Sequence, residues 1–293
     1  MFLEFPSRPA SRLVSAGVIA ALAVSTVPLV RAVDTSTTST STTAEATPTA
    51  EPAREGTGIV VPAPTDVDYQ PVYGSHQASF LRLSDGMHVG SASERLARPA
   101  LSLAKLYIAE YVLNHGTTEE KIQAIAMLTD SSDATAQQLY RTYPESIDET
   151  AKKYQLHATR GAEKWGSSTT STYDVVHFIA ALATQSPMHP ILAAMALSKD
   201  RGADGYPQDY GTIALDGELG TKWGWSDDHT FHSSVSFGEG WVAAAMIAGS
   251  PDDLTNYAEA QLGELATEAE AAAETSSKAA AKERATSTAL KPR

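Results

Sequence analysis

The sequence predicts a mixed α/β domain in which helices flank an antiparallel sheet. Three observations predict this class. Polar and apolar residues alternate around a turn within residues 78–95, a nearly all-apolar helix begins near Leu101, and three strands precede a capped helix late in the chain. Because helical segments separate the first strands from the last ones, we expect both sets to meet in one sheet, with the final helix packed against it.

The first half of the domain is predicted to be a hairpin followed by helices. Ser84-Asp85-Gly86 forms the turn of the hairpin. The apolar run at residues 98–113 then indicates a buried helix. Thr117 and Glu120 have the spacing of a capping box and open the next helix. A further short helix begins after a break, within residues 131–140.

The second half begins with a helix and continues as a sheet. Residues 170–183 form an apolar helix with Ser171 or Thr172 as its cap. Turns rich in Asp and Gly join the three strands predicted next, which lie within residues 218–228, 230–237 and 240–250. Ser250 caps the last helix, and Pro251 takes its first position.

Composition excludes several classes of function. The formal net charge of −13 argues against nucleic acid and against an anionic membrane surface as partners. The chain has no cysteine, so disulfides, thiolate metal sites and cysteine nucleophiles are excluded. Asp227, Asp228, His229 and His232 could suggest a metal, but the aspartates suit a turn and the two histidines point to opposite faces of a strand. We expect no cofactor, no metal and a monomer.

The ends of the chain indicate export. Residues 1–32 read as a signal peptide with basic residues, an apolar core and the small-residue site Val30-Arg31-Ala32; an uncleaved membrane anchor is the alternative. Residues 33–59 are rich in Thr, Ser and Pro, which is typical of a disordered linker. The folded domain is then expected at residues 60–268, and an Ala-rich charged tail at 269–293.

One serine and one lysine stand out within the apolar helix. Ser102 and Lys105 are three residues apart and therefore share a helix face. A lysine taken out of water must be paired or lowered in pKa, and a neutral lysine can remove the proton of a serine hydroxyl. The alternative is a lysine whose ammonium group reaches solvent beside a structural serine.

Two further motifs follow in order: Ser132-Asp133-Ala134-Thr135-Ala136, and Lys222-Trp223-Gly224 on a predicted strand. With these, residues 75–268 resemble the penicillin-recognising serine hydrolases, in particular the class A β-lactamases, which combine S-x-x-K, S-D-N and K-T-G around one cleft. The resemblance implies the β-lactamase/transpeptidase fold, an antiparallel sheet flanked by helices, here with a trimmed helical subdomain.

The resemblance also implies roles for residues of this chain. Ser102 would be the acylated nucleophile, Lys105 its activating partner, and Ser132 a proton relay to the leaving group. Lys222 would supply positive potential for a substrate carboxylate, beside Trp223 and Gly224. The backbone N–H groups of Ser102 and Trp225 would form the oxyanion hole.

Three departures from the family bear on activity. Ala134 replaces the asparagine that orients the substrate, and Trp223 replaces a hydroxyl residue, with bulk that we expect to narrow the cleft. The family's omega loop carries a glutamate that activates the deacylating water. Glu163 is the nearest candidate here, with Ser167 four residues later, and a solvated surface carboxylate is the alternative reading of Glu163.

Two functions from different classes stay open. The first is an exported serine hydrolase, related to β-lactamases and penicillin-binding proteins, that acts on peptidoglycan peptides or binds a β-lactam-like ligand by acyl transfer; we do not expect efficient β-lactam hydrolysis. The second is a non-catalytic relative that binds a cell-wall or protein partner through the same cleft. The Ser102–Lys105 pair favours the first function, and the departures favour the second.

Overall fold

The computed structural model describes residues 76–289. The predicted signal peptide, the linker and the start of the predicted domain lie outside the described residues, as do residues 290–293 of the tail.

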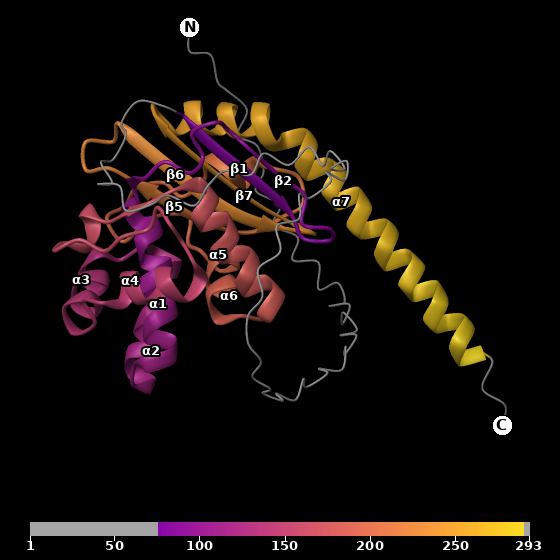
Figure 1. Cartoon of the computed structure of the whole chain (residues 1–293), viewed down its shortest axis with the longest axis horizontal. Helices are drawn as coiled ribbons and strands as arrows, with labels where there is room; N and C mark the ends of the chain where they lie inside the picture. The colour runs from indigo at the N-terminus through magenta and orange to yellow at the C-terminus, as the bar shows by residue number, and fades with distance from the viewer. Residues whose placement is uncertain (1–75, 290–293) are drawn as a thin grey trace, which may run out of the picture. The chain divides into compact units, whose positions relative to one another are not determined.

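A five-stranded antiparallel sheet forms the centre of the described part (Figure 1). Its strand order is β2-β1-β7-β6-β5, so the predicted hairpin lies beside the last strand, and Ser79 stands opposite Ala244. This confirms the mixed α/β class and the predicted meeting of early and late strands. The strands are β1 (Gln77–Arg82), β2 (His88–Gly90), β5 (Glu218–Trp225), β6 (Phe231–Gly238) and β7 (Trp241–Ala248).

Strand β7 shows why the sheet carries helices on both faces. It is apolar and buried from Trp241 to Ile247, so neither of its faces meets water. Val242, Ala244 and Met246 belong to one core cluster, which also contains residues of α1 and α5. The alternate side chains pack against the final helix on the other face. In Figure 1, α7 runs along one side of the sheet, and α1 and α5 lie on the other.

A helical layer is inserted between β2 and β5. Its most buried member is α1, which follows the short 3₁₀ helix η1 and is apolar almost all round, as the sequence predicts. The helices are η1 (Leu101–Leu103), α1 (Ala104–His115), α2 (Thr118–Asp130), α3 (Asp133–Thr142), α4 (Ser146–Tyr154), η2 (Trp165–Ser167), α5 (Thr172–Gln185), α6 (Pro190–Ala196) and η3 (Gly211–Ala214).

Caps set several helix starts as expected. Thr117 and Glu120 form a complete capping box on α2, and Ser171 caps α5. The helices α4 and α6 go beyond the predicted elements. A second, two-stranded ladder joins β3 (Arg98–Pro99) to β4 (Thr169–Thr170). This ladder fixes the chain just before Ser102 to the segment that carries Trp165.

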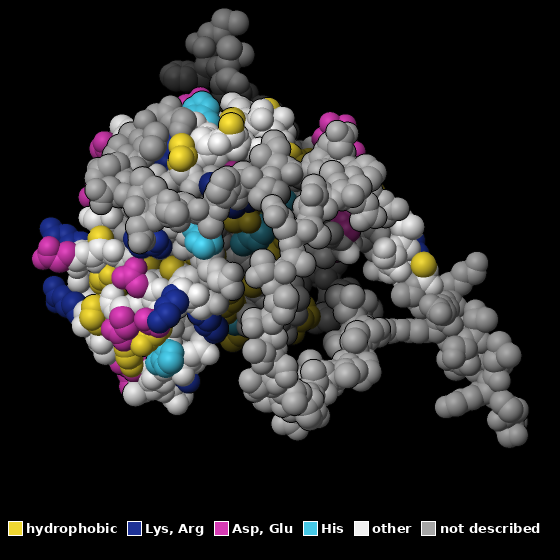
Figure 2. All heavy atoms as spheres, viewed as in Figure 1, with side chains coloured by type: hydrophobic (Ala, Val, Ile, Leu, Met, Phe, Trp, Pro, Cys, Tyr) yellow, Lys and Arg dark blue, Asp and Glu magenta, His cyan; other side chains and the backbone are white. Residues whose placement is uncertain are grey.

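The final helix, α7 (Pro251–Ala289), is held at its start by Ser250, whose Oγ accepts the backbone N–H of Asp253 at 3.1 Å. Buried residues recur every four positions from Leu254 to Ala266, and Ala269 is the last of them; the helix then continues past residue 268. Among residues 76–289, no helix combines the length and apolarity that a membrane span requires. Basic and acidic side chains are interspersed over the helical layer visible in Figure 2.

Candidate active site

Ser102 lies in η1, directly before α1, and is 7% exposed. The preceding residue, Leu101, has φ = 52°, a left-handed conformation that costs a non-glycine residue about 1–2 kcal/mol. The β3–β4 ladder and the η1–α1 junction hold this conformation in place. Backbone strain of this kind concentrates at functional sites.

Lys105 is fully buried, and its Nζ lies 2.6 Å from Ser102 Oγ. The same nitrogen donates to the carbonyl oxygen of Ser131 at 2.8 Å and to Asp133 Oδ1 at 2.6 Å. The ammonium group therefore does not reach solvent, which rules out the alternative of a solvent-reaching lysine. Burial lowers the pKa of Lys105, and the Asp133 carboxylate opposes this shift.

Ser131 links the two lysines of the site. Its Oγ accepts from Lys222 Nζ at 2.7 Å and from Lys105 Nζ at 3.2 Å. Ser131 ends α2 in a left-handed conformation, with φ = 56°, and this turns both its hydroxyl and its carbonyl toward the lysines.

The proton-relay role expected of Ser132 therefore fits the geometry of its neighbour Ser131 instead. Ser132 caps α3: its Oγ accepts the N–H of Thr135 at 3.3 Å and lies 3.0 Å from Thr135 Oγ1. Ser131 holds the position between the lysines instead. Asp133, and not Ala134, then stands two residues after the bridging serine, where the family motif has its asparagine.

Lys222 on β5 is also fully buried. Burial lowers its pKa well below the usual value, and the nearby positive charge of Lys105 acts in the same direction. Its Nζ contacts Ser131 Oγ and the carbonyl oxygen of Trp223, at 2.7 and 3.3 Å. Lys222 thus lies behind the cleft and does not line it.

Trp223 does not narrow the cleft, contrary to expectation. Adjacent residues of a strand face opposite sides, so the side chain of Trp223 points away from that of Lys222. Its Nε1 donates to the carbonyl oxygen of Tyr210 at 2.8 Å, and its ring packs with Leu254 and Ala258 of α7. Trp223 is a core residue between the sheet and α7.

Gly224 lets β5 approach the nucleophile. A Cβ at this position would lie 3.0 Å from Ser102 N and 2.9 Å from Leu101 Cβ. The N–H of Ser226 donates to Phe231 on β6, so the N–H of Trp225 points to the opposite, outer edge of β5. Ser102 N belongs to the first turn of η1, where N–H groups lack a partner within the helix. These two N–H groups suit an oxyanion hole.

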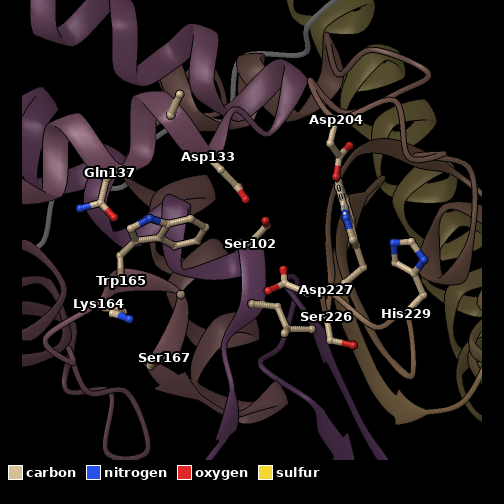
Figure 3. A pocket seen from close by; sticks show the side chains of 14 residues that line it. Ser102, Asp133, Gln137, Lys164, Trp165, Ser167, Asp204, Ser226, Asp227 and His229 are labelled. Atoms are coloured by element: carbon tan, nitrogen blue, oxygen red, sulfur yellow. Dashed lines mark hydrogen bonds between the residues drawn. The ribbon is translucent and has the colours of Figure 1, made fainter.

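Ser102 lines an open cleft of about 880 Å³ (Figure 3). Trp165 stands on one side, and Asp204 and His229 stand on the other. The lining residues are Leu101, Ser102, Asp133, Ala134, Gln137, Lys164, Trp165, Gly166, Ser167, Asp204, Trp225, Ser226, Asp227 and His229.

Glu163 is exposed and is not among the residues that line the cleft. Trp165 is the member of this segment that reaches the site, with its ring centroid 4.7 Å from Lys105 Nζ. No motif in the sequence marks Trp165, and only the fold of the segment brings it to Ser102. The carboxylates of the cleft come instead from Asp133, Asp204 and Asp227.

Comparison with known proteins identifies the fold of the chain. Comparison with protein-family models and with curated sequences finds no match. Among solved structures, a β-lactamase from Streptosporangium roseum matches with a TM-score of 0.51 and 12% identity, over 66% of this chain and 93% of that one. The β-lactamase from Streptomyces albus G matches with a TM-score of 0.50 and 14% identity, over 65% and 93% of the two chains.

Penicillin-binding protein D2 from Listeria monocytogenes gives a TM-score of 0.49 and 19% identity, over 68% of this chain and all of that one. The chain has the fold of the β-lactamases, in a divergent form.

Proposed function

We propose that the protein is an exported serine acyltransferase or hydrolase in which Ser102 is acylated by peptidoglycan peptides or related acyl donors. The observation that carries the proposal is the 2.6 Å contact between Ser102 Oγ and the Nζ of fully buried Lys105. A lysine with a lowered pKa can act as a general base, which an exposed lysine cannot do at neutral pH.

The reaction would begin with attack of Ser102 Oγ on the acyl carbonyl carbon, while neutral Lys105 takes the hydroxyl proton. The N–H groups of Ser102 and Trp225 would hold the oxyanion. As the bond from the carbonyl carbon to the leaving nitrogen breaks, a proton reaches that nitrogen through Ser131, whose Oγ contacts both Lys105 and Lys222. The product is an acyl ester on Ser102.

Hydrolysis of this ester is expected to be slow. Glu163 does not line the cleft, so it is not placed to activate water. Where the segment of Glu163 reaches the cleft, the side chain that enters the lining is that of Trp165. The acyl-enzyme would therefore persist, as in a penicillin-binding protein, and β-lactams would be bound covalently and not efficiently destroyed.

A second function is favoured by one specific contact. The Asp133 carboxylate on Lys105 Nζ stabilises the charged form of the lysine, and a charged lysine cannot accept the proton of Ser102. A non-catalytic protein that binds a cell-wall or protein partner through the cleft would tolerate this contact.

Intact-mass measurement separates the two functions. The mature protein is incubated with a panel of penicillins, cephalosporins and D-amino-acid peptide thioesters, beside Ser102→Ala as control. We expect an adduct of one acyl group on the wild type, none on the variant, and slow loss of the adduct over time. No adduct with any member of the panel would overturn the proposed acylation and leave the binding function.

Export is part of the same proposal, since the acyl donors lie outside the membrane. It is supported by the composition of residues 1–32. Expression of the full chain, followed by cell fractionation and amino-terminal sequencing, should find the protein outside the cytoplasm with Val33 as its first residue. A cytoplasmic protein that retains Met1 would contradict export.

A further inference from the structure

The side chains that line the cleft carry an excess of negative charge. Asp133, Asp204 and Asp227 contribute three carboxylates, and Lys164 contributes one ammonium group. Lys105 offsets one of them, because its Nζ lies 2.6 Å from Asp133 Oδ1. Lys222 is fully buried and bonded to Ser131, so Asp204 and Asp227 face Lys164 as the one exposed ammonium group of the lining. A ligand carboxylate would meet Asp204 and Asp227 before it could meet either buried lysine.

Asp204 is oriented by an aromatic wall. The Nε1 of Trp225 donates to Asp204 Oδ2 at 3.0 Å, and the Trp225 ring stacks on that of Tyr206 with centroids 5.1 Å apart. The N–H of Tyr206 donates to the other carboxylate oxygen of Asp204 at 2.9 Å. The carboxylate is thus fixed at the rim of the cleft by the N–H edge of the Trp225 indole.

Asp227 lines the cleft, whereas its neighbour Asp228 stabilises a turn. Asp228 builds the turn between β5 and β6, since its Oδ1 accepts from Ser226 Oγ at 2.6 Å and from Thr230 Oγ1 at 2.8 Å. Asp227 instead lines the cleft and is directed into it in Figure 3. The turn does not use the Asp227 carboxylate in any of these bonds.

The opposite wall is also suited to a cation. The ring of Trp165 already lies 4.7 Å from one ammonium nitrogen, that of Lys105, and Trp165 lines the cleft from the other side. Aromatic faces attract ammonium and guanidinium groups, and nearby carboxylates add Coulomb attraction.

We infer that, among acyl donors, the cleft prefers those with an ammonium or guanidinium group near the reacting carbonyl to those with a carboxylate there. This rests on the proposed function, because the selected ligand is the acyl donor of Ser102. It departs from the role expected of Lys222, which is to attract a substrate carboxylate. The ligand class is a cationic acyl compound, such as a peptide with a lysine-like side chain.

Equilibrium binding to Ser102→Ala tests the inference without any acylation. Three probes of similar size are titrated against the full chain: the N-methylamides of Nα-acetyl-lysine, Nα-acetyl-norleucine and Nα-acetyl-glutamate. Binding is followed by NMR on the indole N–H signals of Trp165 and Trp225. We expect the lysine probe to bind about tenfold more tightly than the glutamate probe, with the norleucine probe between them and the preference reduced at high salt.

Asp227→Asn should weaken the lysine probe about two- to fivefold, which is the usual effect of one exposed charge pair. Glu259→Gln on α7 is the matched control, because Glu259 is exposed, lies outside the cleft and carries the same charge. Equal or tighter binding of the glutamate probe, or an unchanged lysine affinity in Asp227→Asn, would overturn the inference. Neither result depends on whether Ser102 can be acylated, so the two proposals fail separately.

Discussion

The Oδ1 atom of Asp133 lies 2.6 Å from the Nζ of Lys105, and the same nitrogen lies 2.6 Å from Ser102 Oγ. One lysine thus faces both the hydroxyl that it would deprotonate and a carboxylate that favours its charged form. Burial and the carboxylate act on the pKa of Lys105 in opposite directions, with burial the larger effect. The balance between them decides how much Lys105 is neutral at a given pH.

Asp133→Asn should make Ser102 more reactive. Removing the carboxylate removes an interaction that raises the pKa of Lys105, so the pKa falls further and more of the lysine is neutral near pH 7. Each unit of this shift increases the neutral fraction about tenfold while the lysine is mostly charged. The second-order rate of acylation, measured against pH, should show its rising limb at lower pH in the variant.

Glu163→Gln serves as the control for this variant, since Glu163 carries the same charge and does not line the cleft. An acylation profile of Asp133→Asn that is unchanged, or that moves to higher pH, would contradict the claim that Asp133 favours the charged form of Lys105.

Ser131→Ala should slow acylation, whereas Ser132→Ala should lower the stability of the fold. Loss of the Ser131 hydroxyl breaks the contact with both lysines, and we expect acylation to slow by roughly 10²-fold or more. Loss of the Ser132 hydroxyl removes the cap of α3 and should cost about 1 kcal/mol in the free energy of unfolding, with acylation unchanged. Acylation rates and urea unfolding of both variants check this; the reverse pattern would return the relay to Ser132.

Gly224→Ala should impair acylation and stability together. Its Cβ would lie 2.7 Å from Ser233 Oγ and 3.0 Å from Ser102 N, so β5 must move away from the nucleophile. We expect about 1–3 kcal/mol of destabilisation and a large loss of acylation rate. Gly263→Ala on α7, where a Cβ meets nothing within 4 Å, should leave the rate unaltered. Wild-type acylation by Gly224→Ala would show that β5 does not form part of the site.

His177 should make the protein less stable in mild acid. Burial, together with the positive charges of His88 and Arg95, lowers its pKa to about 4, from an ordinary value of 6.5. Between these two values the unfolded chain binds the proton and the folded chain does not, so stability falls as the pH drops from 6.5 toward 4. His177→Gln should flatten this part of the urea-unfolding profile, whereas His115→Gln, at an exposed position, should not. Parallel profiles for wild type and His177→Gln would refute the assignment.

Much of the fold follows from local signals. The hairpin turn, the capping box at Thr117 and the Ser250 cap each act over a few residues, and so the sequence alone reveals them. The helices α4 and α6 are only 9 and 7 residues long, which is too short for a clear periodic pattern. Their stability comes from packing against α1 and α2, which depends on the whole layer.

The site is predictable only in part. Ser102 and Lys105 follow from helix spacing, but two adjacent serines fit the second motif, and only the left-handed turn at Ser131 decides between them. The orientation of Trp223 does follow from strand alternation once Lys222 is placed toward Ser131. Trp165, Asp204 and Asp227 come from segments that are far apart in the sequence. No local pattern in these segments predicts that the three side chains line one cleft.

The most direct test of the account is the position of the acyl group itself. Wild-type protein and Ser102→Ala are each treated with a reactive β-lactam or peptide thioester, digested and mapped by tandem mass spectrometry. The account predicts one modified peptide in the wild type, with the acyl group on Ser102, and none in the variant. An acyl group on another residue, or equal labelling of both proteins, would contradict Ser102 as the activated nucleophile.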